Sequence, residues 1–172
     1  MSPLARQHGI GVKPQGFAAA RAEVLRLARK YCYAAMATST SAGVPQVAPL
    51  RYTITDDFEV VMGTLRTSRK YVNLTANDRV ALVIWDYELS IQIEGRFDIP
   101  TGADEERLRA QFTAELPREA ELRTGRPNHL YFRVTPHWAR VSDFSDEPPR
   151  VLTIDFLEET ETRGTFPVIA TD

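Results

Sequence analysis

Apolar and polar residues alternate with a period of two along most of this chain, which is the pattern of half-buried β-strands. These segments recur at short intervals and are separated by residues that favour turns. The pattern predicts strands over residues 33–38, 46–55, 58–63, 79–85, 89–98, 130–134, 138–142 and, as a further candidate, 151–156. Short antiparallel strands at this spacing favour a barrel over a doubly wound parallel sheet. We therefore predict a mainly β fold, an antiparallel β-barrel of roughly six to seven strands with flanking helices.

Three segments are predicted to be helices, at residues 17–30, 68–76 and 104–116, the last ended by Pro117. The first of them is amphipathic, with alanines and leucines along one stripe and arginines elsewhere. All three are placed at corners of the barrel.

The two ends of the chain are predicted to lie apart from the barrel. Residues 1–15 contain two glycines and two prolines and are expected to form a flexible arm. Residues 16–156 form the barrel domain. Residues 157–172 are expected to be an acidic tail, because a charge run such as Glu158-Glu159-Thr160-Glu161 is usually solvated.

Composition and charge limit the class of protein. The chain has 172 residues, of which 43% are hydrophobic and 26% charged, as in a soluble globular domain. A net charge of −2 argues against a general nucleic-acid binder. The single cysteine, Cys32, cannot form an internal disulfide, and no apolar run approaches the roughly 20 residues of a membrane span. We expect a cytoplasmic protein with neither a nucleic-acid nor a membrane partner.

Residues that usually carry catalysis or metal binding are sparse. The three histidines, His8, His129 and His137, show no metal-ligand spacing, and there is no Cys-x-x-Cys or His-Glu-x-x-His motif. The sequence also lacks a Ser/His/Asp-like arrangement and a Gly-x-Gly-x-x-Gly loop. We predict no metal site and no catalytic residue supplied by the protein.

The helix that begins at Thr67 or Ser68 carries positive charge where acidic residues are usual. Arg69 and Lys70 occupy its first turn and Arg66 lies just before it. A helix N-terminus is itself partly positive, so each misplaced cation costs about 0.3–1 kcal/mol. A bound phosphate would turn this cost into a gain. The alternative is a basic helix start exposed to solvent.

Polar groups inside apolar strands are a second signal. Arg51 lies in the middle of a mostly apolar strand, where it could face solvent, form an ion pair or bind a ligand. One face of the strand at 89–98 carries a polar row, formed by Ser90, Gln92 and Glu94. This row is either the solvated side of the sheet or a set of hydrogen-bonding groups for a planar heteroaromatic ligand. Trp138 and Arg140 share one face of the strand predicted at 138–142. They are either core residues or part of the wall of a cofactor site.

Four motifs occur in an order that matches a known family. They are Gly43-Val44-Pro45-Gln46-Val47-Ala48-Pro49, Gly63-Thr64-x3-Ser68-Arg69-Lys70-x3-Leu74, Asn77-Asp78-Arg79-Val80-Ala81-Leu82 and Gln92-Ile93-Glu94-Gly95. Together they resemble the pyridoxamine 5′-phosphate oxidase-like family over residues 33–142. Trp85-Asp86-x-Glu88-x-Ser90 resembles a small bacterial subgroup related to that oxidase. The resemblance implies an FMN-binding split β-barrel that forms a homodimer with the flavin at the subunit interface.

The same resemblance implies FMN contacts by position. At the phosphate and ribityl chain it implies contacts from Arg51, Ser68, Arg69 and Lys70. At the ring or the ribityl chain it implies contacts from Met62, Gly63 and Thr64. From the partner subunit it implies contacts by Ser90 and Gln92. The isoalloxazine ring would be flanked by Trp138 and Arg140.

Two departures separate the chain from true oxidases of that family. It lacks the C-terminal Arg-Leu-His segment that grips the vitamin substrate, and Thr55 or Asp56 stands where those oxidases have a lysine. We therefore expect an FMN-dependent oxidoreductase that transfers hydride or electrons to or from an unidentified small molecule, with NAD(P)H as one candidate electron donor. Two alternatives stay open: a deazaflavin (F420)-dependent reductase, and a non-catalytic flavin or haem binding or stress protein.

Overall fold

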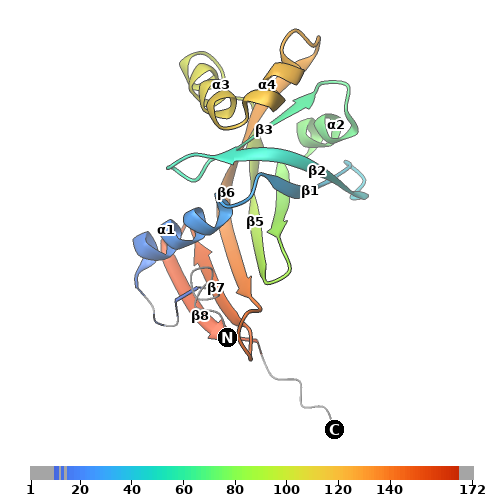
Figure 1. Cartoon of the computed structure of the whole chain (residues 1–172). Helices are drawn as coiled ribbons and strands as arrows, with labels where there is room; N and C mark the ends of the chain where they lie inside the picture. Colours follow the sequence, from blue (N-terminus) through green and yellow to red (C-terminus); the bar gives the residue numbers. More distant parts are fainter. Residues whose placement is uncertain (1–9, 12, 14, 167–172) are drawn as a thin grey trace.

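The computed structural model describes residues 10, 11, 13 and 15–166 (Figure 1). The eight strands of this part of the chain form one antiparallel sheet in the order β3-β2-β1-β4-β5-β6-β7-β8. Because β3 also pairs with β6, strands β1 to β6 close into a barrel, and β7 and β8 extend it. The strands are β1 (Tyr33–Ser39), β2 (Pro45–Ile54), β3 (Val60–Leu65), β4 (Arg79–Trp85), β5 (Leu89–Asp98), β6 (His129–Asp143), β7 (Arg150–Asp155) and β8 (Thr160–Thr165).

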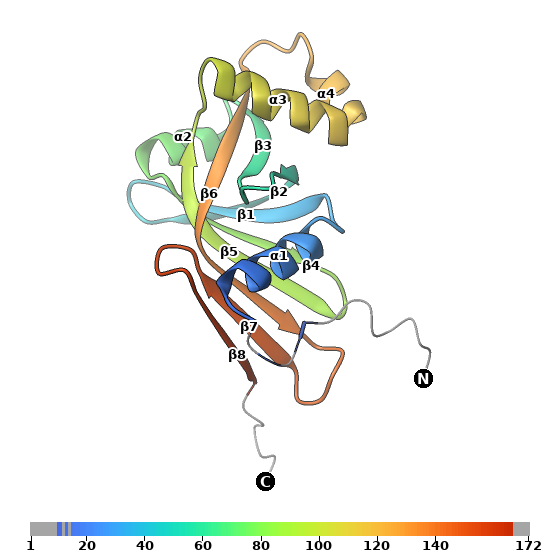
Figure 2. The ribbon, with the colours of Figure 1, turned by 90° about the vertical axis from the view of Figure 1, so that its left-hand side faces the viewer.

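Four helices of the described residues flank this barrel: α1 (Phe17–Ala28), α2 (Arg69–Ala76), α3 (Ala103–Glu115) and α4 (Pro117–Arg123). α3 and α4 lie at one end of the barrel near β3 and α2, and α1 lies beside β7 and β8 towards the other end (Figures 1 and 2). The predicted mainly β barrel with flanking helices is confirmed. No helix within residues 15–166 is long and apolar enough to cross a membrane.

The core fills the inside of the barrel. Alternate residues of each strand point inward, and the fully buried ones include Met36, Tyr52, Met62, Ile84, Ile91, Ile93, Phe132 and Val134. Burying one such side chain contributes about 1.5–3 kcal/mol to folding. α1 adds Val24 and Leu27 to the same core. The alternation that predicted the strands is thus the alternation between core and surface.

β6 is one long strand, although the sequence predicted two strands separated at Pro136. Pro136 pairs with Gly95 next to a bulge between Glu94 and Gly95. A proline is tolerated in a sheet at such an irregularity, because a ladder hydrogen bond is already missing there. The first half of β6 pairs with β3 and the second half with β7. β6 therefore joins the closed barrel to the two extra strands.

Pro117 begins a helix, although the sequence predicted only that it ends one. α3 stops at Glu115, and Pro117 occupies the first turn of α4. A proline suits this position because its fixed φ fits the helix and the missing N–H would have no helical partner. α4 was not predicted, and it carries two residues of the site described below.

The N-terminal arm predicted over residues 1–15 is described only in part, since residues 1–9, 12 and 14 lie outside the described residues. Ile10 is buried, and its backbone N–H donates to Asp143 Oδ2 at 3.1 Å. This part of the arm therefore packs on the domain.

The acidic run near the C-terminus also differs from the predicted solvated tail. Thr160–Thr165 forms β8 and pairs with β7 along its length. Glu161 accepts a hydrogen bond from the Gly16 backbone N–H at 2.6 Å and forms an ion pair with Arg163 at 2.8 Å. Gly16 comes from the opposite end of the chain, and the segment has no apolar alternation of its own, so its sequence did not predict this strand. Residues 167–172 of the predicted tail lie outside the described residues.

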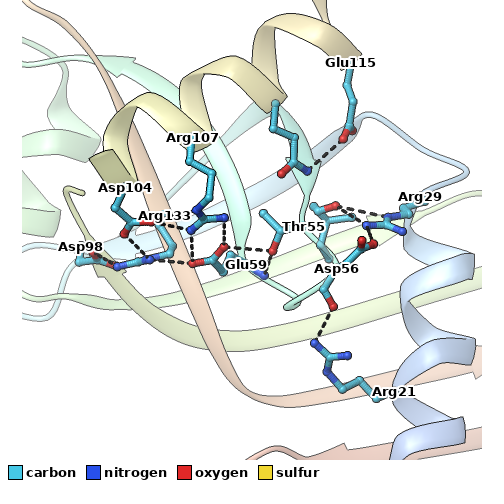
Figure 3. Close-up of polar contacts among 12 residues, drawn as sticks. Arg21, Arg29, Thr55, Asp56, Glu59, Asp98, Asp104, Arg107, Glu115 and Arg133 are labelled. Atoms are coloured by element: carbon cyan, nitrogen blue, oxygen red, sulfur yellow. Dashed lines mark hydrogen bonds and ion pairs between the residues drawn. The ribbon is translucent and has the colours of Figure 1, made fainter. Parts of the chain in front are cut away.

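An ion-pair network fastens α3 to the barrel (Figure 3). Arg133 on β6 lies 2.7 Å from Glu59, and its Nε and Nη2 donate to both carboxylate oxygens of Asp98 at 2.9 and 2.7 Å. Arg107 on α3 donates to Glu59 at 2.9 Å and to Asp104 at 2.6 Å. Because these residues belong to separate elements, the network fixes the position of α3 and, through it, the start of α4.

Candidate functional site

The site is built around the connection from β3 to α2. Ser68 is the N-cap of α2, and its hydroxyl accepts a hydrogen bond from the Tyr71 backbone N–H at 3.3 Å. Thr64, near the end of β3, lies with its Oγ1 2.9 Å from Ser68 Oγ. The first turn of α2 contains no acidic residue. The predicted cap and the predicted basic helix start are both confirmed, with Ser68 as the cap.

The two cations of this first turn lie in different surroundings. Arg69 is exposed and reaches towards Gln46 on β2, whose amide oxygen accepts from Arg69 Nε at 3.1 Å in the orientation that suits both groups. Lys70 is half-buried, and burial together with the charge of Arg123 lowers the pKa of its ammonium. The charge of Arg123 on α4 therefore acts on Lys70.

Gly63 brings two unpredicted residues into the site. A β-carbon on Gly63 would lie 2.7 Å from Arg123 Nη1 and 2.8 Å from His129 Nε2. The absence of a side chain on β3 thus lets both groups pack directly against the strand. Arg123 Nη1 is 3.5 Å from His129 Nε2. Burial and the charges of Arg123 and Arg126 lower the pKa of His129, so its neutral form is favoured.

Arg51 joins this region from β2. Its Nε lies 3.2 Å from Glu119 Oε1, and Arg123 Nη2 lies 3.3 Å from Glu119 Oε2, so one carboxylate on α4 faces two guanidinium groups. The Arg51 guanidinium also lies over the Tyr33 ring, 4.4 Å from its centroid, and its Nη1 is 3.8 Å from Cys32 Sγ. Of the alternatives for Arg51, the structure supports a partly buried ion pair, formed with a helix.

We call Arg51, Lys70, Arg123 and His129 the cation cluster. Its two arginines share the carboxylate of Glu119, and the charge of one of them, Arg123, acts on Lys70. Within the described residues, the buried Nε atoms of Arg51 and Arg123 make no hydrogen bond. The Arg51 Nε is near Glu119 but outside hydrogen-bond geometry. Buried donors without acceptors are costly, so this cluster suits an anion with more oxygens and more charge than a carboxylate.

The cluster is open to ligands at its margin. A cavity of about 290 Å³ lies beside Arg123 and His129, and Arg109, Arg126 and Tyr131 also line it. Sequence reasoning missed Arg123 because α4 was not predicted. His129 was not predicted as a site residue, because it has no metal-ligand spacing, does not lie in an Arg-Leu-His segment, and nothing local relates it to β3.

The remaining predicted residues lie elsewhere. Met62 is fully buried in the barrel core, so its side chain does not face the cluster. On the outer face of β5 and β6, Gln92 pairs in register with Arg140, and Glu94 with Trp138. The predicted set therefore divides into a group at the cation cluster (Arg51, Gly63, Thr64, Ser68 and Lys70), the exposed Arg69, and a group on the outer sheet face (Ser90, Gln92, Trp138 and Arg140).

The outer sheet face around Gln92 is apolar. A shallow cavity of about 320 Å³ is lined by small and branched residues of β1, β2, β4 and β5, among them Ala35, Ala37, Val47, Ala81 and Val83. Val47 is 71% exposed and Trp85 55% exposed. Exposed apolar patches of this kind often mark protein–protein contacts.

Comparison with known proteins adds a family match. The family model described as pyridoxamine 5′-phosphate oxidase matches residues 20–143. Among curated proteins, no sequence matches the chain.

Solved structures with similar folds include proteins of different kinds. PhzG from Burkholderia lata, in complex with tetrahydrophenazine-1-carboxylic acid, has a TM-score of 0.63 and 19% identity over 96% of each chain. A pyridoxamine 5′-phosphate oxidase-related, FMN-binding protein from Nostoc punctiforme has a TM-score of 0.62 and 15% identity over 92% of this chain and 100% of that chain. A haem-binding protein from Mycobacterium smegmatis has a TM-score of 0.64 and 16% identity over 90% of this chain and 60% of that chain.

Proposed function

The chain belongs to the pyridoxamine 5′-phosphate oxidase family, and from this premise we propose that it is an FMN-binding oxidoreductase that acts on a small molecule. The observation that carries the proposal is the cation cluster beside the N-terminus of α2. Lys70 belongs to one of the family-like motifs, and Arg51 lies two residues after another. Arg51 forms an ion pair with Glu119 of α4, and the charge of Arg123 on α4 acts on Lys70.

The residues present fit the phosphoryl end of FMN. A phosphoryl group offers several charged acceptor oxygens, and the cluster offers buried guanidinium donors that lack them. Arg51, Lys70 and the Ser68 region at the start of α2 would hold this group, and Gly63 and Thr64 would lie along the ribityl chain. FMN, when bound, supplies hydride or electron transfer at its ring, and the protein supplies binding and orientation.

We propose that the ring lies between two copies of the chain. The polar group on the outer sheet face, with Ser90, Gln92, Trp138 and Arg140, is on a different surface from the cation cluster. A second copy packed on the exposed apolar face would bring its own polar group to the flavin of the first. Analytical ultracentrifugation tests this proposal, since a monomer with tightly bound flavin contradicts it.

The substrate remains a small molecule other than the vitamin phosphate, because the Arg-Leu-His segment of true oxidases is absent. NAD(P)H is a candidate electron donor. A cytoplasmic location is part of the proposal and is supported by the free thiol of Cys32.

A haem-binding role is the second candidate, supported by the fold of the mycobacterial haem-binding protein. The absorption spectrum of the purified protein separates the two, because oxidised flavin and haem have distinct bands. We expect a flavin spectrum with one FMN per chain and bleaching when NAD(P)H is added without oxygen. A Soret band, or no uptake of added FMN, contradicts the flavin proposal, and bound FMN that no donor reduces contradicts the oxidoreductase role.

A further inference from the structure

Glu119 lies between Arg51 and Arg123 of the cation cluster, although no motif of the sequence placed it there. Its two carboxylate oxygens lie 3.2 Å from Arg51 Nε and 3.3 Å from Arg123 Nη2. Both distances are at the long end for charged groups, which usually approach to about 2.7–2.9 Å. The Nε atoms of both arginines make no hydrogen bond within residues 15–166. The carboxylate thus offsets only part of the charge of the two arginines and leaves both Nε atoms without an acceptor.

We propose that Glu119 is an internal competitor for the phosphoryl group: it occupies the anion position in the free protein and is displaced when a phosphorylated ligand binds. Arg123, released from Glu119, then becomes the third cation on the phosphoryl group beside Arg51 and Lys70. This inference rests on the proposed function, because it concerns the same site. It adds a displacement step and a binding residue to that site.

The surroundings of α4 make such a displacement feasible. The helix has seven residues, and Ala120 is its buried member, packed in a small cluster with Val61, Leu108 and Phe112. The segment that follows contains Gly125 with φ 73° and Asn128 with φ 64°, and its residues 124–128 are exposed. α4 is therefore held mainly by this small cluster and by the Arg51–Glu119 ion pair, since the Glu119–Arg123 pair lies within the helix. Loss of the Arg51–Glu119 pair would release the Glu119 side chain from β2.

Whether a ligand can displace Glu119 depends on the charge of the ligand. A dianionic phosphoryl group brings more charge and more acceptor oxygens than one carboxylate, so it can replace Glu119. A neutral or singly charged group gains too little from the cluster to do so. Glu119 would therefore lower the affinity for FMN below what the cations alone could give, and it would leave the affinity for flavins without a phosphate unchanged, because these do not enter the anion position.

Equilibrium titrations with FMN and with riboflavin, followed by flavin fluorescence, test the proposal on Glu119→Gln. We expect the Kd for FMN to fall about tenfold, as one charged hydrogen-bonding competitor is lost, and the Kd for riboflavin to stay within about twofold. Glu121→Gln is the matched control, since Glu121 is an exposed carboxylate on the same helix. Arg123→Gln is expected to weaken FMN binding about tenfold and to leave riboflavin binding unchanged. An unchanged or higher Kd for FMN in Glu119→Gln overturns the proposal.

Two further measurements distinguish a failure of the competitor role of Glu119 from a failure of the proposed FMN-binding function. Inorganic phosphate should raise the melting temperature of Glu119→Gln more than that of the wild-type protein, whether or not FMN binds; an equal rise overturns the competitor role. If the wild-type protein binds phosphate but not FMN, the proposed function fails. The melting temperatures with phosphate still decide the role of Glu119 in that case. Should Glu119→Gln not fold, a structure of the wild-type protein with FMN decides: a retained Arg51–Glu119 ion pair contradicts displacement, and a broken one supports it.

Discussion

Gly63 and Arg123 are in direct contact, so that a β-carbon on Gly63 would lie 2.7 Å from Arg123 Nη1. The two residues are 60 positions apart in the sequence. The contact exists because β3 and α4 meet at the end of the barrel. The lack of a side chain at Gly63 therefore determines how closely Arg123 and His129 can pack against β3.

Gly63→Ala is expected to displace Arg123 and His129 and to weaken FMN binding by about tenfold. Its effect on the melting temperature should be small by comparison, because flexible side-chain ends can shift. Gly164→Ala is the control, since a β-carbon there meets no atom within 4 Å. Equal FMN affinities in the two variants would show that the contact has no part in binding.

Lys70→Met is expected to affect the free energy of unfolding and the affinity for FMN in different ways. Burial and the charge of Arg123 lower the pKa of Lys70, so the fold disfavours its charged form and loses stability at neutral pH. We expect the variant to keep its free energy of unfolding or to gain well under about 1 kcal/mol, because solvent screens the half-exposed ammonium, and to bind FMN about tenfold more weakly. Lys13→Met, at an exposed lysine, should change neither quantity. Urea unfolding and FMN titration measure both, and a strongly destabilised variant would contradict the assignment.

Glu59→Gln tests the network that holds α3. Glu59 accepts from Arg107 and Arg133, so the variant leaves both guanidinium groups with weaker partners. We expect the free energy of unfolding to fall by about 1–3 kcal/mol. Asp78→Asn breaks the exposed Arg96–Asp78 pair and should cost less than about 1 kcal/mol. Equal losses would mean that the network is no stronger than a surface pair.

The pH dependence of stability follows from the same carboxylate. Burial alone raises the pKa of Glu59, but hydrogen bonds from Arg107, Arg133 and Thr55 outweigh it and hold the pKa below its ordinary value of 4.5. The ionised form is thus favoured in the folded state, and its contribution is present above pH 4.5 and lost as the pH falls through the lower folded pKa. The difference in unfolding free energy between wild type and Glu59→Gln should shrink over that range. A constant difference would contradict this role.

The sequence predicts the barrel well because core and surface alternate in most strands. β1 to β5 are found within two residues of their predicted bounds, since each presents alternate apolar residues to one core. β8 escapes prediction because Thr160–Thr165 has no apolar alternation and gains its strand from pairing with β7. α4 escapes because it is short and starts at a proline.

The candidate site shows the same division between local and distant information. Gly63, Thr64, Ser68 and Lys70 lie within one continuous motif, and the cap and basic turn that they form can be recognised there. Glu119, Arg123 and His129 reach the site only through the placement of α3, α4 and β6. That placement depends on the network around Arg133, which no single segment encodes.

FMN and riboflavin differ by the phosphoryl group, so the ratio of their affinities for the wild-type protein measures whether the cation cluster binds that group. Isothermal titration should give a Kd for FMN about a hundredfold lower than that for riboflavin, as expected for two or more charged hydrogen bonds to the phosphoryl oxygens. Equal affinities for the two flavins would show that the cation cluster does not hold a phosphoryl group.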